Sequence, residues 1–256
     1  MSHLAAPAAL FYKLNAMFPS GGGQIEQIVL RVTHFAAGIT WIGLLYFFNL
    51  IATPVMAKCD PQMRSRVYAE LMPRAMGWFR FSAALAWLAG FRYFMILAQT
   101  DAANAGDPGL MGKWLGIWFA VWVVAFAILM GLLQSPISKN GWLLGVVAAI
   151  VLAVASWLVL DLIAASPAAG NRTLCIAVGG GLGTIMFLSV WGIVWRCQKK
   201  LIKWHTASVQ TGAPMPPEAA KVARLSFVTA RLNFWISFPM LFFMGASSHF
   251  PFLSGK

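Results

Sequence analysis

Long runs of apolar residues, separated by shorter polar segments, dominate the chain. Each run is close to the about 20 residues that an α-helix needs to cross a hydrocarbon layer of about 30 Å. A lipid-exposed segment must also satisfy its own backbone hydrogen bonds, so each run is predicted to be helical. The pattern predicts six transmembrane helices, near residues 27–55, 77–97, 114–133, 142–165, 173–195 and 226–247.

Composition supports this assignment. Of the 256 residues, 60% are hydrophobic and 10% are charged, whereas soluble domains are about 45–50% apolar and about 25% charged. The sequence therefore excludes a soluble globular protein. It predicts an all-α polytopic membrane bundle: a single six-helix transmembrane domain at residues 25–256, preceded by a tail at residues 1–24.

The net charge of +12 follows membrane topology rather than a nucleic-acid surface. Eleven Lys and Arg residues lie in the segments near 57–76, 134–141 and 196–225, against five on the opposite side of the predicted bundle. Because positive residues accumulate on the cytoplasmic side, these segments are expected to be cytoplasmic loops and both termini periplasmic. No nucleic-acid partner is expected, since the basic residues do not cluster with a readable motif.

The first 24 residues carry a second, weaker apolar pattern. They lack a basic n-region and a cleavage site, so a cleaved signal peptide is not expected. The spacing of their apolar residues predicts a short helix lying on the outer membrane surface, separated from the first span by a break at residues 20–23.

Two histidines fall in the outer halves of the first and last predicted spans. His34 lies one and a half to two turns inside the first span, beside small residues at 36–38 that let a flat ligand approach. His249 lies at the outer end of the last span, just before Pro251. An ionisable side chain at membrane depth costs at least about 2.5 kcal/mol on insertion scales, so each invites a functional explanation. Neutral imidazoles bind haem iron, and the pair predicts a b-type haem with His34 and His249 as metal ligands.

The register of the last span decides whether both histidines reach one iron. If that helix begins at Ser226, His249 lies at the interface and His34 about two turns deeper, too far apart to share an iron. If it begins beyond Arg231, the two can meet. The sequence leaves both registers open, and a histidine hydrogen-bonded between helices is the structural alternative for His34.

Arg92 is the predicted partner of the haem propionates, because a buried guanidinium suits a carboxylate. An interhelical ion pair between Arg92 and Asp161 is the alternative. A copper site would need several gathered His, Cys or Met ligands, and Met244 close to His249 is insufficient. His205, in the segment after the fifth span, is expected to be solvated or interfacial. The three cysteines form neither a CxxC nor a CxxCH pattern.

Two further patterns indicate helix packing. Trp114, Trp118 and Trp122 form an i, i+4, i+8 stripe, typical of an aromatic belt or a packed core. Gly179 and Gly183 form a small-xxx-small pair, which predicts a close helix contact rather than a phosphate loop.

Three stretches together resemble the membrane domain of the bacterial urate hydroxylases, which are membrane-anchored, cytochrome c-linked urate oxidases. The stretches are HFAAGITWIGLLYFFN at 34–49, GLGTIMFLSVWGIVW at 181–195 with QKK at 198–200, and RLNFWISFPMLFFM at 231–244 with SHFP at 248–251. They lie at the start, middle and end, so the resemblance covers nearly the whole chain. In that family a c-type cytochrome domain follows the membrane domain, and the protein is thought to oxidise urate while passing electrons to the respiratory chain.

The resemblance implies an oxidoreductase-type subunit of the bacterial inner membrane. No CxxCH occurs in this sequence, so electrons are expected to pass from haem b to a separate periplasmic c-type cytochrome or within a larger membrane complex. The alternative is a non-enzymatic structural or assembly subunit of a respiratory, photosynthetic or oxygenase complex. A transporter is disfavoured, because no internal inverted repeat is evident.

Overall fold

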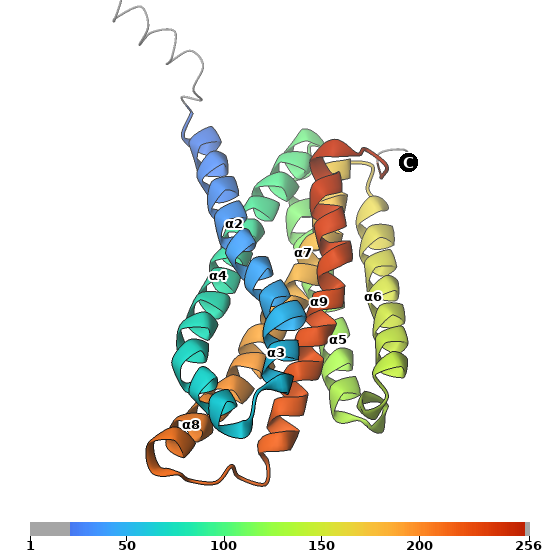
Figure 1. Cartoon of the computed structure of the whole chain (residues 1–256). Coiled ribbons are helices and arrows are strands. Elements are labelled where there is room, and N and C mark those ends of the chain that lie inside the picture. The colour runs from blue at the N-terminus through green and yellow to red at the C-terminus, as the bar shows by residue number, and fades with distance from the viewer. Residues whose placement is uncertain (1–20, 254–256) are drawn as a thin grey trace, which may run out of the picture.

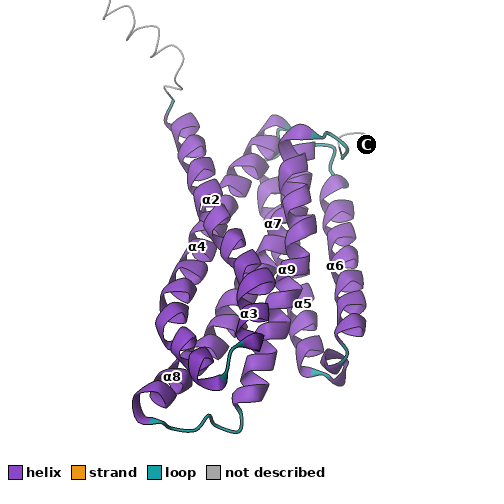
Figure 2. Cartoon of the chain, in the orientation of Figure 1, coloured by secondary structure: helices purple, strands orange, loops and turns teal. Residues whose placement is uncertain are grey.

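The computed structural model describes residues 21–253, and every regular element in that range is helical (Figures 1 and 2). The elements are α2 (Gly22–Tyr46), η1 (Phe47–Ala52), α3 (Thr53–Lys58), α4 (Pro61–Asn104), α5 (Gly109–Gln134), η2 (Pro136–Lys139), α6 (Gly141–Ala164), α7 (Asn171–Ser189), η3 (Val190–Val194), α8 (Trp195–Thr211) and α9 (Ala219–His249). Here η1 and η3 are π-helical and η2 is a 3₁₀ turn.

Six helical segments of the described range are long and apolar enough to cross a membrane. They are Gly22–Lys58, Pro61–Asn104, Gly109–Gln134, Gly141–Ala164, Asn171–Thr211 and Ala219–His249. Each contains one of the predicted apolar runs or nearly all of it, so the predicted all-α, six-span architecture is confirmed.

The N-terminal prediction is tested only where the structure describes the chain. The predicted surface helix lies almost entirely outside the described residues. Gly22 and Gly23 belong to α2, so the predicted break does not extend over them.

Two of the three segments predicted as loops are mainly helical. Most of segment 57–76 is the start of α4, and within segment 196–225 the residues between α8 and α9 are 212–218. At a rise of 1.5 Å per residue, the 44 residues of α4 span about 66 Å, roughly twice the hydrocarbon thickness. A scan for apolar runs detects the part of a helix that lies in lipid. It misses these polar extensions, where α4 and α8 pack against each other.

The bundle has two ends with different composition. The start of α2 and the end of α9 lie at one end, here called the terminal end (Figure 1). The α3–α4 turn, α8 and the 212–218 connection lie at the other, here called the basic end because it carries the eleven Lys and Arg residues counted above. An even number of spans brings the first and last described helix ends to the same end of the bundle.

Helix α7 is the most buried span, because its glycines let neighbours approach closely. A Cβ at Gly179 would lie 3.1 Å from the Cβ of Phe243 and 3.3 Å from the backbone oxygen of Met240, both on α9. The predicted close contact at Gly179 is therefore confirmed, and α9 is its partner. Gly183 is looser, with the Met240 side chain 4.0 Å from its hypothetical Cβ.

The tryptophan stripe of α5 is packed into the bundle. Trp114, Trp118 and Trp122 are buried, and the indole N–H groups of the last two donate to the carbonyl of Ala177 on α7, at 2.7 and 3.2 Å. A Cβ at Gly181 would overlap the Trp122 indole. The stripe thus belongs to the core, where it fills the space that the α7 glycines leave.

Candidate functional site

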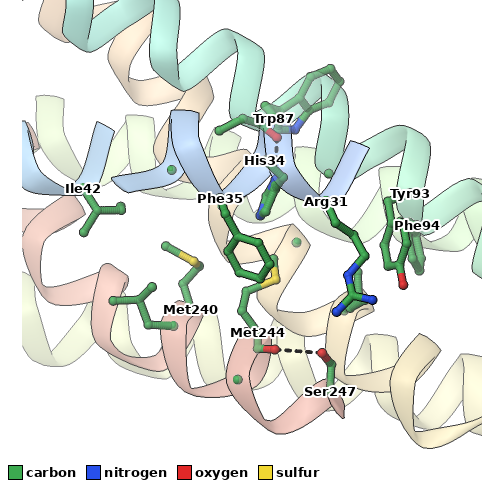
Figure 3. A pocket seen from close by; sticks show the side chains of 18 of the residues that line it. Arg31, His34, Phe35, Ile42, Trp87, Tyr93, Phe94, Met240, Met244 and Ser247 are labelled. Carbon is green, nitrogen blue, oxygen red and sulfur yellow. Dashed lines mark hydrogen bonds between the residues drawn. The ribbon is translucent and has the colours of Figure 1, made fainter. Parts of the chain in front are cut away.

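A cavity of about 570 Å³ lies at the terminal end of the bundle, between α2, α4, α7 and α9 (Figure 3). Its wall is mostly apolar and aromatic, and its volume falls in the about 300–1,000 Å³ range of small-molecule sites. Figure 3 shows the side chains of Arg31, His34 and Phe35 from α2, Trp87, Tyr93 and Phe94 from α4, and Met240 and Met244 from α9 gathered around it.

His34 is held in the cavity wall by helix α4. Its Nδ1 lies 2.8 Å from the carbonyl oxygen of Ala86, which fixes the N–H on Nδ1 because a carbonyl only accepts. Nε2 has no hydrogen-bond partner among the described residues and is left with its lone pair. The ring fits because residue 90 is glycine: a Cβ there would lie 2.7 Å from the Cε1 and Nδ1 atoms of His34.

His249 lines the same cavity from the last residue of α9. Its Nδ1 lies 2.9 Å from the carbonyl of Gly245, one turn back in the same helix. This contact again assigns the N–H to Nδ1 and leaves Nε2 available. Unlike His34, this side chain is exposed at the mouth. The helix starts at Ala219, before either start considered from the sequence, yet both histidines reach one cavity.

Arg92 is placed differently from either expectation. It is absent from the residues that line the cavity, and its Nε donates to the Glu26 carboxylate at 2.7 Å. Both side chains are a little less than half exposed, and Asp161 is exposed on α6 without an ion pair in the described range. The alternative Arg92–Asp161 pair is therefore wrong. Arg92 turns away from the cavity because Gly90, Phe91 and neighbouring lining residues occupy the inner face of α4.

Two other arginines line the cavity. Arg31 lies one turn before His34 on α2, and Arg172 lies in the first turn of α7. Neither has an ion-pair partner within residues 21–253. Arg31 could have been found by its i, i+3 relation to His34, which places both on one helix face. Arg172 carries no comparable signal, because its position depends on how α7 packs.

The cavity is also lined by a pair of methionines that was not predicted from the sequence. Met240 and Met244 are one turn apart on α9 and line the cavity beside Phe35 (Figure 3). Their i, i+4 spacing is the signal that places both on the face turned to α2. A thioether is a soft ligand and also a flexible core side chain.

A cluster rich in metal-ligating residues does not form elsewhere. No group of three or more His, Cys, Asp or Glu side chains is close enough to hold an ion in the described range. Cys59, Cys175 and Cys197 are free thiols. The candidate donors at the cavity are thus imidazole and thioether groups, a set that suits a haem iron better than a free divalent ion.

The comparison with known families agrees with this architecture. A family model described as "Urate oxidase N-terminal" matches residues 62–256, more than half of the chain. The chain belongs to the urate oxidase N-terminal family. His249, Arg172, Met240 and Met244 lie within the match, whereas α2 with His34 precedes it. No curated protein and no solved structure matches significantly.

The basic end holds a third histidine, His205, whose environment differs from the solvated or interfacial one that the sequence predicts. His205 on α8 is buried, not solvated: its ring stacks on Tyr68 at 4.4 Å between centroids, and its Nδ1 lies 3.0 Å from the Ser65 hydroxyl. Both partners lie in the polar extension of α4, within the segment 57–76 that hydropathy predicts to be a loop.

Proposed function

We propose that this protein is a redox subunit of the bacterial inner membrane that binds b-type haem in the terminal-end cavity. The observation that carries the proposal is that His34 and His249, far apart in sequence, line one cavity and each bond a backbone carbonyl through Nδ1. Metal-binding histidines commonly present one nitrogen while the other donates to such a group.

The residues present fit a haem. The cavity wall is aromatic and apolar, as a porphyrin requires, and the glycines at 38 and 43 leave α2 open on that side. The two arginines at the mouth, Arg31 and Arg172, are unpaired in the described range and suit carboxylates. They replace Arg92 as the proposed propionate partners.

A bound haem supplies reversible one-electron transfer at iron, chemistry that no side chain of the cavity provides. The chain's own residues then have distinct tasks. His34 and His249 would hold the iron through Nε2, Gly90 admits the His34 ring, and the aromatic wall would shield the group from water. Exclusion of water and the choice of axial ligand are the means by which a protein sets a haem potential.

The partner of this redox subunit is proposed to be a periplasmic c-type cytochrome or a larger membrane complex. The cavity lies at the terminal end, which the positive-inside rule predicts to face the periplasm, and His249 is exposed there. Family membership supports the oxidoreductase context. The alternative is a structural subunit without haem, and the experiment must distinguish it from the haem-binding redox subunit.

The test is an absorbance spectrum of the protein purified with haem supplied during expression. We expect a Soret band and a reduced-minus-oxidised α-band with b-type haem. His34→Ala is expected to lose the α-band, and added imidazole to restore it, because the vacated site admits a free ligand. His249→Ala is expected to weaken haem binding or, if Met244 takes its place, to change the ligand signature.

Two control variants separate ligation from folding. Val32→Ala lies on the same helix as His34 but faces away from the cavity, and Arg92→Gln removes the exposed partner of Glu26. Both are expected to keep the wild-type spectrum. A protein without a Soret band or iron, with all four variants equally stable, would favour the structural subunit.

A further inference from the structure

A second cavity, of about 740 Å³, lies at the basic end. Phe48, Leu71, Met76 and other apolar side chains form one part of its wall, and buried polar groups of α4 and α8 form another. Ile51, Val55 and Phe227 are exposed as well as lining it, so the cavity reaches the lipid-facing surface of η1, α3 and α9. It is therefore an amphiphilic space with access from the bilayer.

The polar part of this wall is a connected cluster of side chains. His205 stacks on Tyr68 and bonds Ser65 through Nδ1. Gln198, two turns earlier on α8, donates from Nε2 to the Ser226 hydroxyl of α9 at 2.9 Å and also interacts with the Tyr68 hydroxyl. Three helices thus contribute to one network of buried polar groups, in which every unsatisfied member is costly.

One atom of the network is left without a hydrogen-bond partner. The Gln198 side chain is 9% exposed, yet its Oε1 has no partner among the described residues. A buried carbonyl without a donor costs about 1–3 kcal/mol. An amide oxygen accepts and never donates, so the missing group is a donor. His205 Nε2 also has no partner in the described part of the chain, and an imidazole nitrogen accepts or donates according to its tautomer.

Both π-helical segments of the described chain border this cavity. Residues 47–49 and 51–52 of η1 line it on one side, and Val194 of η3 lines it on another. A π-helical turn interrupts the regular α-helical ladder and occurs mostly at functional sites. Two such turns at one cavity indicate a site rather than a packing defect.

We propose that the basic-end cavity binds the headgroup of a membrane-borne isoprenoid quinol. A quinol is a planar ring with two hydroxyl donors and an apolar tail. One hydroxyl donates to Gln198 Oε1, the second bonds His205 Nε2, and the tail leaves toward the lipid past the exposed residues of η1 and α3. The proposal concerns binding and does not depend on haem at the other end.

The hydrogen-bond demand of the site favours a neutral donor over an anionic ligand. Arg64 and Arg224 line the cavity, but their guanidinium groups donate to backbone carbonyls of Met56, Cys59 and Ser138, at 3.0, 3.0 and 2.8 Å. The unpartnered group at the centre is an oxygen, which a carboxylate or phosphate would repel. A neutral donor satisfies it without a charge.

The experiment is an anaerobic calorimetric titration, in which decylubiquinol is added to the detergent-solubilised chain and the heat of binding is measured. We expect saturable binding, and 1-decanol is expected not to compete, because it lacks the ring and the second hydroxyl. Gln198→Leu is expected to weaken binding about tenfold, the effect of one lost hydrogen bond to a buried acceptor. Its thermal midpoint is expected to stay close to wild type, since the lost bond to Ser226 is offset by removal of the unpartnered carbonyl.

The matched control is Gln134→Leu at the same end of the bundle. Gln134 is exposed, donates to Met130 of its own helix and lines neither cavity, so its substitution is expected to leave decylubiquinol binding unchanged. His205→Phe keeps the stacking on Tyr68 and removes both nitrogens, and is expected to weaken binding as Gln198→Leu does. His34→Ala is expected to bind decylubiquinol normally, which separates this proposal from the haem proposal.

Photolabelling of the unsubstituted chain with an azidoquinone gives a test that needs no variant. Labelled peptides are expected from residues 61–76 or 195–211. The proposal is overturned by an absence of saturable binding, by equal competition from 1-decanol, by unchanged affinity in Gln198→Leu, or by labelling confined to peptides with His34 or Met244.

Discussion

The two cavities of the bundle each contain a histidine between helices, but they hold it by different means. At the terminal end, His34 bonds the backbone carbonyl of Ala86 and lies against a glycine. At the basic end, His205 bonds a serine hydroxyl and stacks on a tyrosine. The first arrangement is built by the approach of two helix backbones, and the second by side chains. Substitutions that add volume should therefore damage the terminal end, whereas substitutions that remove polar atoms should damage the basic end.

The largest effect is expected from Gly181→Ala, on the α7 wall behind the terminal-end cavity. The added Cβ would overlap the Trp122 indole, which is buried and bonded to Ala177. Overpacking a filled core costs about 1–3 kcal/mol, so the free energy of unfolding is expected to fall by that amount. Denaturant unfolding in detergent, followed by helical circular dichroism, measures it.

Gly183→Ala is the matched control for that change. It lies two residues away on the same helix, where the nearest side-chain atom is 4.0 Å from the hypothetical Cβ. Its stability is expected to equal or slightly exceed wild type, because alanine favours a helix over glycine. Equal stability of Gly181→Ala and Gly183→Ala would show that backbone approach does not limit the terminal end.

An intermediate effect is expected from Gly90→Ala. The new Cβ would lie 2.7 Å from the His34 ring, so the ring must rotate and give up its bond to Ala86. The lost hydrogen bond is worth about 0.5–1.5 kcal/mol. We also expect haem content to fall, since Nε2 is no longer presented to the cavity. Thermal unfolding and haem content by absorbance measure the two parts.

Gly77→Ala on the same helix is the comparison for Gly90→Ala. Nothing lies within 4 Å of its hypothetical Cβ, and it lines neither cavity. It is expected to keep the wild-type haem content and gain up to about 1 kcal/mol of helix stability. Full haem content in Gly90→Ala would mean that the orientation of His34 does not matter.

The sequence predicted how deep residues lie better than which way they face. Apolar runs located all six spans, and the depth of His34 and His249 indicated one end of the bundle. Helix rotation was not predictable. Arg92 has suitable depth, but residues 90, 91, 93 and 94 face the cavity and residue 92 does not. Rotation is set by packing partners, and the apolar pattern of a membrane helix contains little information about them.

The polar site at the basic end was missed for a different reason. Ser65, Tyr68 and His205 lie in segments whose composition is that of membrane loops, so hydropathy gave no cue that they are helical. Their contact joins residues far apart in sequence across two helix extensions. The aromatic and polar residues at 65, 68, 198 and 205 fall at helical spacing within each segment, which is the signal that a helix-period count would have detected.

The smallest expected effect concerns the start of α4, the helix that carries Ser65 and Tyr68 to the basic end. Asp60 caps it: its Oδ1 accepts from the backbone N–H groups of Met63 and Gln62, both at 2.9 Å. Chiefly because of the Met63 N–H, the pKa of the Asp60 carboxyl lies below its ordinary value of 3.8.

A carboxyl with a lowered folded-state pKa adds stability that is complete above the ordinary value and is lost as the pH falls through the folded value. The thermal midpoint is therefore expected to fall below about pH 4 slightly more steeply in wild type than in Asp60→Asn, which still caps the helix but does not titrate. Because Asp60 is solvent-exposed, the difference should be small and should leave the terminal-end cavity unaffected. Parallel pH profiles of the two proteins would mean that the cap contributes nothing through its charge.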